Sequence, residues 1–172
     1  MEYIIREALE SDARRINDIA NWYIENTAVN FDTETWPLEM RLEWLKTFNH
    51  STSPYKLLVF ESDGLVIGFA CNTRFRPKVA YTSSTETTVY IANDVTSNGR
   101  GGKLYQALFD AISTSPFHRA IAVITLPNPA SIALHERMGF SLVGTFDEVG
   151  RKFTKYHSVA MYQKNLSPQF EQ

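Results

Sequence analysis

The chain has 172 residues, of which 44% are hydrophobic and 21% charged, and its net charge at pH 7 is −2. These values predict one globular domain with a substantial core, and give no reason to expect nucleic acid or an anionic membrane as partner. The one cysteine, Cys71, excludes an internal disulfide framework and a cysteine zinc cluster. No apolar run approaches the ~20 residues of a membrane span, and charges come too early for a signal peptide. We therefore expect a cytoplasmic protein.

The predicted elements alternate between strands and helices along the chain. Strands are expected at residues 3–6, 56–61, 65–72, 86–91, 119–125, 141–149 and 152–164. Helices are expected after Ser11, after Pro37, from Leu104 to Ile112 and from Pro129. Asp63-Gly64 indicates a hairpin between the second and third strands. The pattern predicts one α/β domain over residues 1–166 with a mixed sheet, followed by a disordered tail over 167–172.

The most informative segment runs from Glu86 to Ile112, a strand followed by a glycine-rich loop and an amphipathic helix. Gly99, Gly101 and Gly102 lie just before the helical stripe. A glycine loop that enters a helix directs unpaired backbone N–H groups and the positive end of the helix dipole at one point, which suits a phosphate or pyrophosphate. The spacing fits neither a nucleotide P-loop nor the Rossmann pattern. A glycine-rich turn with no ligand is the alternative.

A second segment, from Asn128 to Phe140, follows the strand at 119–125. Asn128 is a good N-cap and Pro129 suits the first helical turn. Ser131 and His135 are four residues apart and share one helix face, and Gly139 fits the position that ends the helix. A face that carries Ser and His beside a capping Asn can line a groove for the polar arm of a cofactor.

Both segments resemble the acetyl-CoA-binding motifs of the GNAT acetyltransferase superfamily. Residues 96–101 resemble the pyrophosphate loop Q/R-x-x-G-x-G/A, with Thr96 at the position where Gln or Arg is usual. Residues 128–140 resemble N-x-x-[SA]-x-x-[LF]-Y-E-x-x-G-F, with His135 in place of Tyr, as in the phosphinothricin acetyltransferase branch. Residues 27–31 and 86–90, with the late Lys152 and His157, are also similar to that branch.

The resemblance implies the GNAT fold, with about six to seven strands in a mixed sheet and about four helices, and a homodimer. It implies acetyl-CoA as acetyl donor. No spacing of His, Cys or carboxylate residues in the sequence suggests a metal site. The cofactor residues that it implies, including a strand backbone that binds the thioester oxygen, are Val89, Tyr90, Ile91, Thr96, Asn98, Gly99, Arg100, Gly101, Gly102, Lys103, Leu104, Asn128 and Ser131. In place of Thr96, Arg100 or Lys103 is expected to contact the pyrophosphate.

The expected reaction is transfer of the acetyl group to a primary amine by direct attack. Glu86 matches the catalytic glutamate of the phosphinothricin branch, and partial burial among uncharged neighbours would raise its pKa toward the working range. A solvated glutamate at a strand start is the alternative. His135 occupies the position from which the leaving thiolate can be protonated, although a structural hydrogen-bonding role is as compatible with the sequence. Tyr105 either contacts the cofactor or is a packed aromatic residue.

The substrate pocket is expected from Phe31, the loop from Arg74 to Tyr81, His157 and a dimer partner. Arg74 and Arg76 alternate with Phe75, and arginine binds carboxylates with a bidentate fork. A small amino-acid-like amine of the phosphinothricin or methionine sulfoximine type is therefore the expected substrate. Ordinary surface arginines remain an alternative. Two other functions stay open: acetylation of protein or peptide amines, and acyl-CoA sensing without turnover.

Overall fold

The computed structural model describes residues 3–48, 53–95 and 98–166. They form a seven-stranded sheet in the order β1-β2-β3-β4-β5-β7-β6. The strands are β1 (Tyr3–Glu7), β2 (Leu57–Ser62), β3 (Leu65–Arg74), β4 (Ser84–Ile91), β5 (Arg119–Thr125), β6 (Ser141–Lys152) and β7 (Lys155–Asn165). All neighbours are antiparallel except β4 and β5, so the sheet is mixed.

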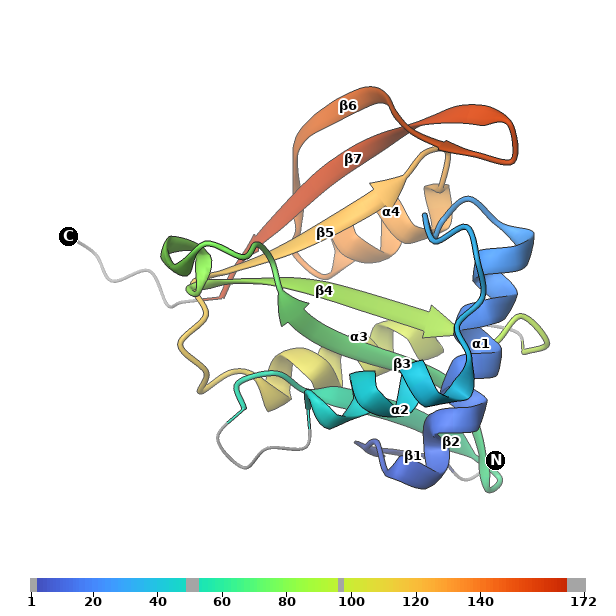
Figure 1. Cartoon of the computed structure of the whole chain (residues 1–172). Coiled ribbons are helices and arrows are strands. Elements are labelled where there is room, and N and C mark those ends of the chain that lie inside the picture. Colours follow the sequence, from blue (N-terminus) through green and yellow to red (C-terminus); the bar gives the residue numbers. More distant parts are fainter. Residues whose placement is uncertain (1–2, 49–52, 96–97, 167–172) are drawn as a thin grey trace.

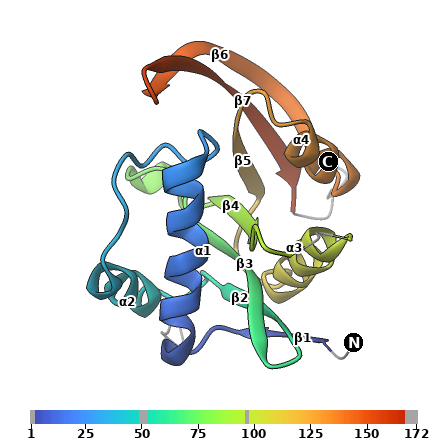
Figure 2. The same ribbon diagram turned by 90° about the vertical axis from the view of Figure 1, so that its right-hand side faces the viewer.

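Four α-helices cover the two faces of this sheet (Figures 1 and 2). The helices are α1 (Ala13–Asn26), α2 (Leu38–Lys46), α3 (Arg100–Ala111) and α4 (Pro129–Arg137). Figure 2 shows α1 and α2 on one face of the sheet and α3 on the other, with α4 beside β5 and β7. Short 3₁₀ turns, η1 (Glu10–Asp12) and η2 (Val79–Tyr81), precede α1 and β4. None of the helices in the described ranges is both long and apolar enough to cross a membrane.

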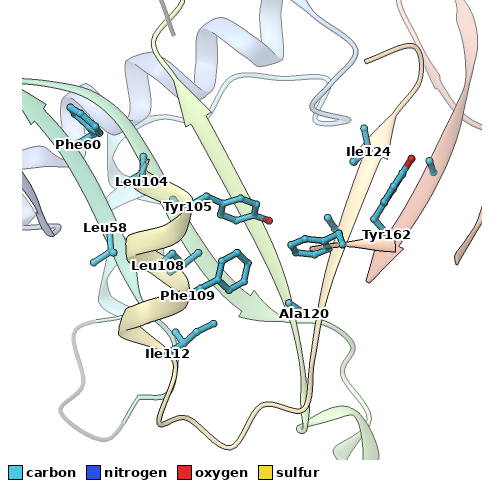
Figure 3. Packing of buried hydrophobic residues seen from close by; sticks show 14 of the residues in the cluster. Leu58, Phe60, Leu104, Tyr105, Leu108, Phe109, Ile112, Ala120, Ile124 and Tyr162 are labelled. Atoms are coloured by element: carbon cyan, nitrogen blue, oxygen red, sulfur yellow. The ribbon is translucent and has the colours of Figure 1, made fainter. Parts of the chain in front are cut away.

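The core consists of one hydrophobic cluster on each face. On one face, Ile16 and Ile19 of α1 and Leu45 of α2 pack with Val59 and Phe69 of the sheet. On the other face, Leu104, Tyr105, Leu108 and Phe109 of α3 point toward the sheet, as Figure 3 shows. The helical spacing of these residues explains why α3 and α1 fold against opposite sides.

The sequence predicted the order and type of these elements, and the expected mixed α/β fold is confirmed. Asp63 and Gly64, with φ of 50° and 78°, form the two-residue turn between β2 and β3, as expected. The last hairpin turns later than expected, at Phe153 and Thr154, whose φ angles are also positive. Ser11 does not cap α1, because it lies inside η1. Residues 167–172 and the tail expected there lie outside the described part of the chain.

Candidate active site

The strands β4 and β5 separate soon after they begin. They pair only from Ser84 to Glu86 on β4, opposite Arg119 to Ile121 on β5, and Figure 1 shows them diverging toward their C-terminal ends. β4 pairs with β3 in antiparallel register, and the Ala92 N–H donates to the Ile67 carbonyl. In such a ladder the N–H and C=O groups of alternate residues point to opposite sides of the strand, here toward β3 or toward β5. Val89 and Ile91 therefore direct their backbone groups into the gap.

A cavity of about 850 Å³ occupies this gap and reaches both faces of the sheet. From the α3 and α4 side it is lined by Gly99, Gly101, Gly102, Asn128, Ser131, Leu134 and His135. From the α1 and α2 side it is lined by Tyr23, Asn30, Phe31, Asp32, Trp36, Arg41, Trp44, Glu86 and Tyr90. Two ligands can therefore meet in the gap between β4 and β5 from opposite faces.

The first turn of α3 forms one wall of the cavity. Gly99 is the N-cap, with φ of 77°, a left-handed conformation that favours glycine. A Cβ atom on Gly101 would lie 3.6 Å from Leu134 and one on Gly102 would lie 3.7 Å from it, ordinary contact distances. Gly101 and Gly102 line the cavity in the first turn of α3, where backbone N–H groups lack helical partners, as a pyrophosphate site requires.

The α4 helix has the predicted start and end. The Asn128 side chain accepts a hydrogen bond from the Ser131 N–H at 3.1 Å, and Pro129 occupies the first turn. At the other end, Gly139 has φ of 84°, its N–H donates to the Glu136 carbonyl, and the Phe140 N–H donates to the His135 carbonyl. This is the Schellman arrangement, and it fixes the short helix that carries Ser131 and His135 at the cavity.

Glu86 lines the cavity on the face of the sheet that carries α1 and α2. Its side chain is half-buried, and burial raises the pKa of its carboxyl group. Its neighbour Thr87 points to the opposite face, where its hydroxyl contacts Tyr105. Glu86 is thus a partly desolvated carboxylate at the narrow end of the gap, with the placement and basicity that a general base needs.

His135 lies on the opposite face, in a buried hydrogen-bonded chain. Its Nδ1 is 2.8 Å from the Ser131 carbonyl, which can only accept, so Nδ1 carries the proton. Its Nε2 then accepts from the Tyr105 hydroxyl at 3.1 Å, and that hydroxyl is 2.5 Å from Thr87 Oγ1. Burial lowers the pKa of His135, which favours this neutral form. Tyr105 itself is fully buried and is not among the residues that line the cavity, whereas His135 is.

Phe31 stands at the cavity because the β6 strand supports its loop. The Phe31 ring packs directly against the backbone of Gly150, and a Cβ atom on residue 150 would clash with the ring. The buried Lys152 donates a hydrogen bond to the Asn30 carbonyl at 2.6 Å. The β6 strand therefore holds the loop that closes the α1 and α2 side of the cavity.

Several residues predicted from the sequence lie away from this cavity. Leu104 is fully buried in the core, and Lys103 contacts Tyr3 instead. Arg74 is exposed and donates hydrogen bonds to the carbonyls of Arg76 and Pro77. Cavity-lining residues of this single chain do not include Asn98, Arg100, Arg76, Tyr81 or His157. Thr96 lies outside the described residues.

The most notable residue that the sequence analysis missed is Arg41. The sequence analysis gave Arg41 no role, yet the residue is only 5% exposed. Its spacing from Leu45 and Phe48, four and seven residues later, places it on the buried stripe and could have revealed it.

The family of the chain follows from this geometry and from comparisons with known proteins. Residues 5–161 match the model of the acetyltransferase (GNAT) domain, and the chain belongs to that family. Strands that part around a cavity, beside a helix that starts with glycines, are the acetyl-CoA site of such acetyltransferases.

More particular similarities point to one branch. The chain is 42% identical, over 96% of its length and 97% of the relative's, to a phosphinothricin N-acetyltransferase of Streptomyces coelicolor. It is 32% identical, over 98% of its length and 97% of the relative's, to an L-methionine sulfoximine/L-methionine sulfone acetyltransferase of Pseudomonas aeruginosa. The crystal structure of a GNAT phosphinothricin acetyltransferase from Sinorhizobium meliloti with acetyl-CoA matches with a TM-score of 0.88 and 29% identity, covering 97% of this chain and 90% of that one.

Proposed function

We propose that this acetyltransferase moves the acetyl group of acetyl-CoA to the primary amine of a small amino-acid-like substrate of the phosphinothricin or methionine sulfoximine type. The observation that carries the proposal is the cavity between β4 and β5, which has a helix start built from glycines on one face and a partly buried carboxylate on the other. The relatives from Streptomyces and Pseudomonas support the substrate class.

On the α3 and α4 side, the chain binds the donor. The free N–H groups at Gly101 and Gly102 hold the pyrophosphate, and Asn128 and Ser131 line the path of the pantetheine arm. The glycine backbone at the start of α3 and the groove beside α4 fit the pyrophosphate and the pantetheine arm of acetyl-CoA. At the gap, the N–H groups of Val89 and Ile91 are placed to stabilise negative charge that develops on the thioester oxygen.

On the α1 and α2 side, the chain binds the amine and activates it. An ammonium group is not a nucleophile, so Glu86 removes a proton as the amine attacks the thioester carbon. Phe31 and the tryptophans of the cavity wall exclude water and hold the amine in line with the thioester. The leaving thiolate takes its proton on the other face, where Tyr105 and His135 lie.

A thiol-release assay tests the proposal directly. Purified protein is mixed with acetyl-CoA and a panel that contains phosphinothricin, methionine sulfoximine, methionine sulfone, a lysine-containing peptide and a peptide with a free N-terminus. We expect release of CoA with the small amino acids and detection of their N-acetyl products by mass spectrometry. Turnover restricted to the peptides would show that the substrates are peptide amines and not small amino acids. Binding of acetyl-CoA without turnover on any amine would favour the sensing alternative.

We also propose that the chain forms a homodimer through the β6 and β7 side of the sheet and acts in the cytoplasm. The β6 strand is an edge strand, and Leu142, Val143, Phe146 and Val149 on it are all more than half exposed. Such a row of exposed apolar residues on an edge is typical of an interface. The cytoplasmic location is supported by the donor, which is an intracellular metabolite. Sedimentation of the parent and of Val143→Asp tests the dimer, since a monomeric parent contradicts it.

A further inference from the structure

Arg41 is a buried cation in the wall of the cavity. Its guanidinium carbon lies 4.2 Å from the centre of the Trp36 ring and 4.7 Å from that of Trp44, so two indole faces hold it in place. Its Nε donates to Asn17 Oδ1 at 3.2 Å. Burial lowers the pKa of Arg41 to about 10, so the group remains charged at neutral pH.

The other two nitrogens of this guanidinium have no hydrogen-bond partner among the described residues, and no carboxylate of that part of the chain lies within the 4.0 Å of an ion pair. Across the same residues, no fully buried side-chain nitrogen or oxygen lacks a partner. The terminal nitrogens of Arg41 must therefore retain access to the cavity that the residue lines. Four N–H donors of one fixed cation are thus available to a ligand.

Arg41 and Glu86 lie on the same face of the sheet but at different places in the cavity. Arg41 lies over the Trp44 ring, and Trp44 packs against Phe69 of β3. Phe69 pairs with Tyr90, four residues after Glu86 along β4, whereas Glu86 itself pairs with Thr73. The separation leaves room for a substrate that spans the two groups.

We propose that Arg41 binds an oxygen-bearing, preferably anionic, group at the far end of the substrate side chain, while the amine lies at Glu86. This inference rests on the proposed function and deepens it, because it makes Arg41 the residue that selects a side-chain oxyanion. A planar guanidinium fork donates two parallel hydrogen bonds to two oxygens on one atom, as a phosphinate or a sulfone presents them.

Three substrates with the same amine and carboxylate test this directly. Phosphinothricin has an anionic phosphinate on its side chain, methionine sulfone has two uncharged oxygens, and methionine has neither. We expect kcat/KM of the parent to fall in that order. In Arg41→Met, which keeps the length of the side chain between the tryptophans, we expect a loss of roughly 10- to 100-fold for phosphinothricin, expressed mainly in KM. Methionine should change less than threefold, and acetyl-CoA affinity, measured by calorimetry, should not change.

Two further variants make the outcome decisive. Arg41→Lys keeps the charge but not the fork, so an intermediate loss for phosphinothricin is expected. Arg15→Met is the matched control, because Arg15 binds the Val66 carbonyl and Asp94 outside the cavity; its substrate ratios should equal those of the parent. If Arg41→Met fails to fold, Arg41→Lys and the substrate order of the parent decide.

Each contrary result has one meaning. Equal losses for all three substrates would show that Arg41 only supports packing, and an unchanged ratio of phosphinothricin to methionine in Arg41→Met would overturn the proposal. A parent that does not prefer the side-chain oxyanion would overturn it without any variant. A parent that acetylates no amine would instead contradict the proposed function.

Discussion

Replacement of Glu86 by Gln separates basicity from shape at a carboxylate that lines the cavity beside the paired part of β4 and β5. General-base catalysis is worth roughly 10²–10⁴ in rate. Because burial raises the pKa of Glu86, the group is a stronger base than a solvated glutamate, and we expect a loss of that order in kcat. The affinity for acetyl-CoA should change little, since the first turn of α3 lies on the other face of the sheet.

The pH dependence gives a second readout of the same variant. In the parent, kcat/KM should rise with pH as Glu86 loses its proton, at a pH above the ordinary value of 4.5 because the pKa is raised. This acidic limb should be absent from Glu86→Gln. When folding raises the pKa of a carboxyl group, the folded state binds that proton more tightly than the unfolded state does. The stabilisation from this proton is lost as pH rises through the folded pKa. Glu86→Gln should therefore be at least as stable as the parent at pH 7.

The assay is release of CoA with saturating phosphinothricin, combined with thermal unfolding. Glu136→Gln is the matched control, because Glu136 is exposed on α4 and does not line the cavity. Activity of Glu86→Gln within threefold of the parent would refute the assignment and show that another group or water takes the proton.

Four other variants test the remaining predictions. Gly101→Val should weaken acetyl-CoA binding at least tenfold, about 1.4 kcal/mol. The protein should stay folded, because the new Cβ atom lies at an ordinary contact distance of 3.6 Å from Leu134. An unchanged affinity in calorimetry would reject the pyrophosphate site. Tyr105→Phe should lower kcat roughly 10²-fold with little change in acetyl-CoA affinity, and full activity would contradict a proton path through Tyr105. Because Arg74 and Arg76 lie outside the cavity of their own chain, Arg74→Met and Arg76→Met should leave the kcat/KM ratio of methionine sulfone to its decarboxylated amine unchanged. A tenfold fall of this ratio in either variant would show that a loop arginine binds the carboxylate.

The donor half of the site could be predicted because its signals are local. The glycines before α3 and the capping residues of α4 act through backbone conformation within a few residues, and a single sequence contains that information. Asn128 and Gly139 were assigned by the same rules, and the structure confirms both. The parting of β4 and β5 came only from the family resemblance, since no local pattern specifies where two paired strands separate.

The acceptor half could not be predicted in the same way, because it is assembled from distant segments. Arg41 reaches the cavity only because α2 packs beside α1, and Phe31 only because Gly150 leaves space for its ring. The turn at Phe153 and Thr154 lacks the usual Asn-Gly or Asp-Gly signal, so the length of β6 was underestimated. Arg74 and Arg76, predicted from alternation alone, lie outside the cavity of their own chain.

The alternation of one strand explains how the two halves act on one bond. Successive residues of β4 face opposite sides of the sheet, so Glu86 faces α1 and α2, and Thr87 faces Tyr105 and His135 on the other side. A proton must be removed from the amine and another supplied to the thiolate in the same transfer. In the proposed reaction these two tasks lie on opposite faces of the sheet, with the Glu86 carboxylate on one and the neutral His135 imidazole on the other. The parting of β4 from β5 immediately after Glu86 places the reacting atoms between them.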